Sequence, residues 1–83
     1  MQTAKFDELA GRIEGLSWAV LQLTAALEMQ SLIDGPRLSE RWRGSLSPRN
    51  VDTPMRQEAR TYLQTLATLL DEARSSRQSR AGQ

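Results

Sequence analysis

Large apolar residues recur along the first third of the chain at alternating spacings of three and four. The series, which we call the heptad row, is Phe6, Leu9, Ile13, Leu16, Val20, Leu23 and Leu27. These spacings place all seven side chains on one stripe of an α-helix and form a heptad repeat. They predict a long helix over about residues 3–33, because Gly35-Pro36 cannot continue it.

A second apolar stripe lies off the heptad row on the same predicted helix. It consists of Trp18, Leu21, Ala25, Met29 and Leu32. A helix that is apolar on two sides is normally covered on two sides. We expect the chain's own second long helix to cover one stripe. The other stripe then needs the middle segment, a second copy of the chain or a different protein.

Two further helices follow. Pro36 suits the first turn of a short helix over about 36–43, with Leu38 and Trp42 on one face and three arginines on the other. Residues 44–53 are rich in turn formers and predict a linker. Thr53-Pro54 is typical of an N-cap followed by the first helical residue. Apolar residues then repeat at heptad spacing over a predicted helix at about 54–75, namely Met55, Ala59, Tyr62, Leu66, Leu69 and Ala73.

These elements predict an all-α fold, an antiparallel helical hairpin with a short middle helix. We expect residues 1–75 to form one domain and residues 76–83, which hold no large apolar side chain, to be a disordered tail. A chain of 83 residues buries only a small core. Since the second stripe also needs a cover, we expect a homodimer of the four-helix-bundle type.

Composition argues against catalysis. The chain has no Cys and no His, so it lacks disulfides, thiolate ligands and the commonest general base. There is no glycine-rich phosphate loop, and no serine has a histidine partner. We expect no enzyme activity, no cofactor and no metal site. No apolar run approaches the roughly 20 residues that span a bilayer, and the N-terminus lacks a signal-peptide pattern. We therefore expect a cytoplasmic protein without membrane contact.

Charge is unevenly distributed although the net charge is only +1. Residues 1–35 carry two basic and five acidic side chains, whereas residues 36–60 carry six basic and three acidic ones. This asymmetry favours antiparallel or intersubunit charge matching. A protein-binding function follows best, since Trp and Arg are enriched among interface anchors. The predicted contact residues are the apolar anchors Trp18, Leu21, Met29 and Trp42, with Arg37, Arg41 and Arg43 selecting an acidic partner surface.

Nucleic-acid binding is the alternative for the same middle segment. Arg37, Arg41, Arg43 and Arg49 surround Trp42, which could stack on a base. The net charge is far below that of a dedicated nucleic-acid binder. Trp42, four residues after Leu38, is also explained as a core residue.

Four stretches follow one another along the chain: the run from Leu9 to Leu23, LAGRIEGLSWAVLQL, then Ser31–Asp34, a proline-bearing linker, and the stretch from Asp52 to Leu70. In this order they resemble the small enterobacterial anti-adapter family that stabilises the stationary-phase sigma factor. The resemblance implies a long N-terminal helix, a linker and a C-terminal helix. It also implies a regulator that binds a response-regulator adaptor and blocks proteolytic delivery, and it transfers no functional residue. Type III secretion chaperones and phage-encoded inhibitors, including anti-CRISPR proteins, are small helical proteins of similar appearance and remain alternatives.

Overall fold

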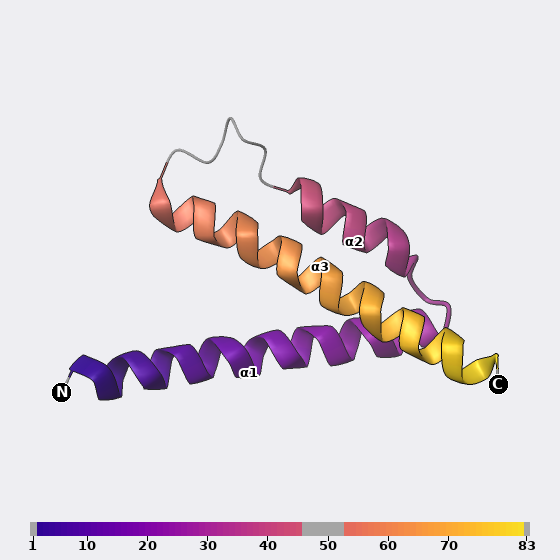
Figure 1. The fold of residues 1–83 in the computed structure, drawn as a ribbon, viewed down its shortest axis with the longest axis horizontal. Helices are drawn as coiled ribbons and strands as arrows, with labels where there is room; N and C mark the ends of the chain where they lie inside the picture. Colours follow the sequence, from indigo (N-terminus) through magenta and orange to yellow (C-terminus); the bar gives the residue numbers. More distant parts are fainter. Residues whose placement is uncertain (1, 46–52, 83) are drawn as a thin grey trace.

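Three helices make up the part of the chain that the computed structural model describes, residues 2–45 and 53–82. They are α1 (Gln2–Met29), α2 (Gly35–Gly44) and α3 (Pro54–Ala81) (Figure 1). No β-strand occurs in these two segments, so the predicted all-α class is confirmed. Most of the predicted linker, with Arg49, falls outside the described residues.

Helix α1 ends at Met29, four residues before the predicted end near residue 33. The Leu32 amide donates to the Leu27 carbonyl at 2.9 Å, and the Ser31 amide donates to the Glu28 carbonyl at 2.9 Å. This is the Schellman arrangement, in which the residue after the cap adopts a left-handed backbone. Ser31 takes that conformation, with φ of 60°, at a position usually held by glycine. For this reason the early stop has no signal in the sequence.

The starts of α2 and α3 follow the same local rule. The Thr53 hydroxyl accepts a hydrogen bond from the Arg56 amide at 3.2 Å, so the predicted N-cap of α3 is confirmed. The Asp34 carboxylate caps α2 in the same way, accepting from the Arg37 amide at 3.1 Å. Pro36 and Pro54 each lie in the first turn, where a missing amide proton costs nothing.

The predicted antiparallel pairing of the two long helices is wrong. Ser17 of α1 bonds to Tyr62 of α3, and Glu28 of α1 pairs with Arg74 of α3, so residue numbers rise together along both helices. In Figure 1 both helices run from left to right, while α2 runs back along α3. The physical reason is that α2 runs opposite to α1 and α3 runs opposite to α2, so the two long helices share one direction. Helices α1 and α3 diverge toward the N-terminus of α1.

The apolar core is small and is built by the second stripe of α1. Leu21 packs with Leu66 and Leu70 of α3, and Ala25 and Trp42 contact this cluster. The heptad row, which we expected α3 to cover, is left largely exposed. The chain therefore buries Leu21 and Ala25 of the second stripe and leaves Trp18, Met29 and Leu32 of that stripe, together with most of the heptad row, exposed.

The C-terminal segment is helical, which corrects the predicted disordered tail from residue 76. Helix α3 continues to Ala81, and the Gly82 amide donates to the Gln78 carbonyl at 3.0 Å. The segment lacks large apolar residues, but Arg77 bonds to Glu28 near the end of α1. A charged contact, which apolar periodicity does not reveal, thus fixes the last turns of α3.

Candidate partner-binding surfaces

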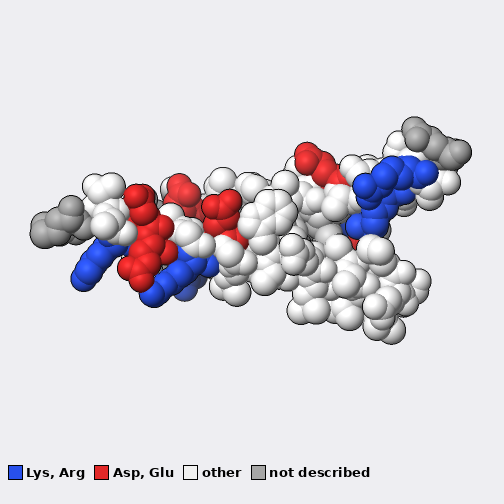
Figure 2. Space-filling view, turned by 90° about the horizontal axis from the view of Figure 1, so that it is seen from below, with Lys and Arg blue, Asp and Glu red and all other residues white. Residues whose placement is uncertain are grey.

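The heptad row forms the most extended exposed apolar surface of α1. Five of its side chains remain more than half exposed, namely Phe6, Leu9, Ile13, Leu16 and Leu23. Residues 15–27 contain no charged side chain. Figure 2 shows charged groups gathered toward the N-terminal end of α1 and a broad uncharged stretch in the middle of this view. Contiguous exposed apolar patches of this kind mark interaction surfaces in soluble proteins.

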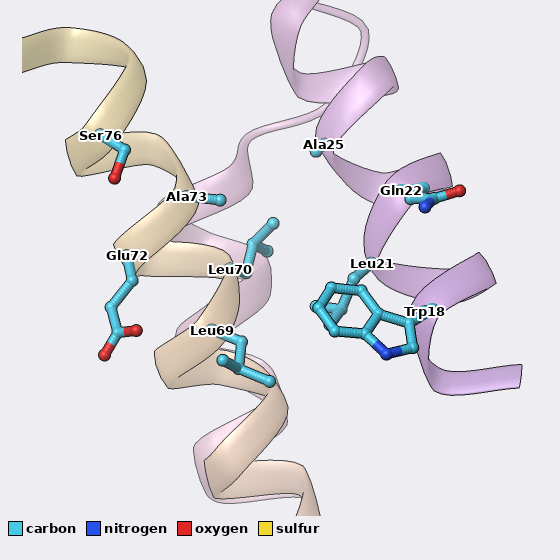
Figure 3. A pocket seen from close by; sticks show the side chains of 9 residues that line it. All are labelled: Trp18, Leu21, Gln22, Ala25, Leu69, Leu70, Glu72, Ala73 and Ser76. Carbon is cyan, nitrogen blue, oxygen red and sulfur yellow. The ribbon is translucent and has the colours of Figure 1, made fainter. Parts of the chain in front are cut away.

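A groove between α1 and α3 forms a second apolar surface. Its volume is about 330 Å³, and Trp18, Leu69 and Leu70 point into it (Figure 3). Trp18 stays 53% exposed, although it lines the groove together with the core residue Leu21. The groove is large enough for an apolar side chain or a small ligand. Among the predicted contact residues, Trp18 is the aromatic side chain that remains accessible to a partner.

The other predicted contact residues divide into exposed and engaged groups. Met29, Arg37 and Arg41 are exposed. Arg37 and Arg41 lie one helical turn apart on α2 and line a shallow depression. This exposed pair is on α2, whereas the Trp18 groove is formed by α1 and α3.

Three residues that were predicted to contact a partner instead make contacts within the chain. Leu21 is buried in the core, and Trp42 is half-buried against it. Arg43 donates to Asp71 at 2.6 Å and to Glu40 at 3.0 Å. The cause is the return of α2 along α3, which brings the Trp42 face onto Leu66 and Leu70 and the Arg43 side chain onto Asp71.

A network of ion pairs joins all three helices. At its centre, Arg74 of α3 donates two hydrogen bonds of 2.8 and 3.0 Å to the Glu28 carboxylate. Arg77 adds a third bond to Glu28 at 2.7 Å, and Arg74 also donates to Asp71 at 2.8 Å. The side chains of Glu28 and Arg74 are only 11% and 16% exposed. Partly buried, bidentate pairs of this kind are stronger than solvated surface pairs.

The network changes the acid–base properties of its members. Burial of Asp71 disfavours its charged form, but hydrogen bonds from Arg43 and Arg74 outweigh this and lower the pKa of the carboxyl to about 2. The Glu28 carboxylate raises the pKa of the Arg74 guanidinium. Each pairing therefore stabilises the charged form of its partner, which is the property of a structural network.

Gly35 leaves room for the centre of this network. A Cβ atom built at Gly35 would lie 1.5 Å from the Glu28 carboxylate oxygen and 2.8 Å from its Cγ atom. Since Arg74 and Arg77 hold that carboxylate, it has little freedom to move aside. Gly35 thus has a packing role, in place of the helix-terminating role that the sequence suggested.

The sequence analysis did not identify this network. Two of its pairs, Glu40–Arg43 and Asp71–Arg74, have the spacing of neighbours on one helix face. The pairs that cross between helices, Glu28 with Arg74 and Asp71 with Arg43, depend on how the helices are placed. No spacing within one helix could have indicated them.

Searches of the described segments for other kinds of site give two negative findings. Residues 2–45 and 53–82 include no group of three or more acidic side chains arranged to hold a metal ion. None of the three described helices has the length and hydropathy needed to cross a bilayer.

Comparison of the chain with protein-family models, with curated proteins and with solved structures finds no match in any of the three.

Proposed function

We propose that this chain is a non-enzymatic regulatory protein that acts by binding another protein and so sequestering or inhibiting it. The observation that supports this best is the apolar groove between α1 and α3, where the Trp18 side chain stays 53% exposed beside Leu69 and Leu70. Leaving apolar surface in water is unfavourable, by roughly 25 cal/mol per Å². Binding removes that cost, and this gives the chain a driving force for association.

The contact surface that we propose for the regulated partner is narrower than the sequence suggested. Trp18 at the groove and Met29 at the end of α1 would supply apolar contacts, while Arg37 and Arg41 would favour an acidic partner. Aromatic and Arg side chains of this kind dominate the binding energy of many interfaces. The resemblance to the anti-adapter family points to the same type of action.

Self-association is a further part of the proposal. The core of one chain consists of a few side chains around Leu21, Leu66 and Leu70, which is little for three helices. A homodimer would add apolar burial that one chain lacks. Pairing through α1 would place two copies side by side in a bundle of helices.

Capture from a lysate of the native host tests the binding of a regulated partner. The test variant carries Trp18→Ala with Arg41→Ala, and the matched control carries Met55→Ala with Arg80→Ala on α3. All four side chains are exposed, so both variants should keep the helical content of the wild type by circular dichroism. We expect the wild type and the control to recover the same protein and the test variant to recover at least about tenfold less of it. Equal recovery by all three chains would exclude this contact surface.

A further inference from the structure

We infer that the heptad row of α1 pairs with the same row of a second copy of this chain, as a parallel two-stranded coiled coil. This inference rests on the proposed function and specifies one partner and one geometry for it. The first observation is register. Alternate members of the row fall into two sets, Phe6, Ile13, Val20 and Leu27 at the a positions of the heptad, and Leu9, Leu16 and Leu23 at the d positions.

The residue types at these positions favour two parallel strands. Beta-branched side chains at a, here Ile13 and Val20, combined with Leu at every d position, are the combination that favours parallel dimers. In a parallel pair, a packs against a and d against d, so each set meets its own kind. A second copy supplies this repeat in register along its whole length.

The heptad row is also accessible to a second copy, because α2 and α3 of the same chain do not cover it. The α1 side chains that face α3 or the network are Ser17, Leu21, Thr24 and Glu28. At about 100° per residue, their stripe lies roughly a quarter of a turn from the heptad row. A two-fold axis along the row would place the two α3 helices on opposite sides of the α1 pair. A second copy could therefore dock without displacing α2 or α3.

The positions that flank the row are compatible with this pairing. In a parallel pair each g residue lies beside the following e residue of the other copy. Lys5 would then lie beside Ala10, and Arg12 beside Ser17, so no like charges meet. The later g positions carry Ala19 and Ala26, which are small enough for close approach, whereas the e positions Ser17 and Thr24 lie on the side of α1 that α3 covers.

The available area suffices for a specific dimer. Five side chains of the row on each copy are more than half exposed. If each of these ten side chains buries roughly 100 Å² of apolar surface, the two copies together bury roughly 1,000 Å². That is about the smallest area of a specific interface, and Val20, Leu27 and the flanking residues add to it.

Light scattering at micromolar concentrations tests the pairing with two matched variants. Leu16 and Met29 lie on the same helix and are 68% and 64% exposed, but only Leu16 belongs to the row. We expect the wild type and Met29→Lys to have about twice the chain mass of 9.3 kDa, and Leu16→Lys to have the mass of one chain. The helices α2 and α3 should be unchanged in Leu16→Lys. A wild type that stays at the mass of one chain, or that forms trimers or larger species, overturns the inference.

Disulfide cross-linking tests the orientation, since the natural chain has no Cys. In a parallel pair, Leu9→Cys brings the two thiols together and should give a covalent dimer in a glutathione buffer. Thr68→Cys, on the exposed face of α3, is the control and should remain reduced. An antiparallel pair would move the two introduced thiols apart, and dimers without cross-linking at Leu9→Cys would overturn the parallel geometry.

The two proposals fail in different ways. A monomeric wild type whose captured protein is lost in Leu16→Lys would show that the row binds a different protein. That result overturns self-pairing and leaves the regulatory function standing. A dimer that captures the same proteins with and without Trp18 and Arg41 would leave self-pairing standing and exclude the contact surface proposed for the regulated partner.

Discussion

The Glu28 side chain contacts both of the other helices, α3 through two arginines and α2 at Gly35. Glu28 is the only acid of α1 that is nearly buried, and two arginines of α3 neutralise it. The first residue of α2 lies against the same carboxylate. One residue therefore ties the ends of α1 and α3 to the start of α2.

We predict that Gly35→Ala destabilises the chain, because the added methyl group forces the Glu28 carboxylate away from Arg74 and Arg77. The expected loss is about 1–3 kcal/mol in the free energy of unfolding, the range for a buried group that loses its hydrogen bonds. Urea unfolding followed by circular dichroism measures it. Gly44→Ala is the control, since nothing lies within 4 Å of a Cβ atom there, and it should be neutral or slightly stabilising.

A second prediction concerns pH. The pKa of Asp71 falls from 3.8 in the unfolded chain to about 2 in the folded one. Its contribution to stability is therefore complete above about pH 4 and is lost as the pH falls through about 2. We expect this contribution to be below about 2 kcal/mol, since the carboxylate is partly solvated. Urea titrations at pH 6 and pH 2.5 should show a smaller acid loss for Asp71→Asn than for the wild type. An equal loss in both chains would contradict the assigned role.

At the scale of elements, α1 is one helix with two different halves. Its N-terminal half, residues 3–16, is exposed throughout, whereas Ser17, Leu21, Thr24 and Glu28 connect the C-terminal half to α3. In Figure 1 the N-terminal half extends away from the other two helices. Isolated helices of this length are marginal in water, so we expect the N-terminal half to gain stability from a partner.

Hydrogen exchange tests this difference in the Leu16→Lys chain, which should be monomeric. We expect backbone amides of residues 5–14 to exchange at least about tenfold faster than those of residues 20–28, because only the latter lie beside tertiary contacts. In the wild type, pairing of the heptad row should reduce this difference. Equal protection of both halves in the monomeric variant would show that α1 is stable without a partner.

At the scale of the molecule, the three helices form a thin body of 49 × 33 × 21 Å. A body so thin has little interior, which explains why the core is confined to a few side chains. Its charge is also less available than the sequence suggested. Arg43, Arg74 and Arg77 are engaged by Asp71 and Glu28, so Arg37 and Arg41 are the exposed pair left on α2.

This distribution predicts weak nucleic-acid binding. Two arginines that contact phosphates give a slope of about −2 in a plot of log affinity against log salt concentration, well below the slope of a dedicated binder. Fluorescence anisotropy with a labelled random duplex at low and physiological salt measures it. We expect no detectable binding at physiological salt. Tight binding that is lost in Arg37→Gln with Arg41→Gln, and kept in Arg80→Gln, would favour the nucleic-acid function instead.

The sequence by itself determined the helices and their starting points. Capping and periodicity are local properties, so Thr53-Pro54, Pro36 and the two stripes of α1 could all be recognised from spacing alone. Only the tertiary structure decided which stripe is buried, that α1 and α3 run in the same direction, and that Glu28 is held by Arg74. The physical reason is that these outcomes depend on two chain reversals and on charge pairs between residues more than 40 positions apart, which spacing along one helix does not encode.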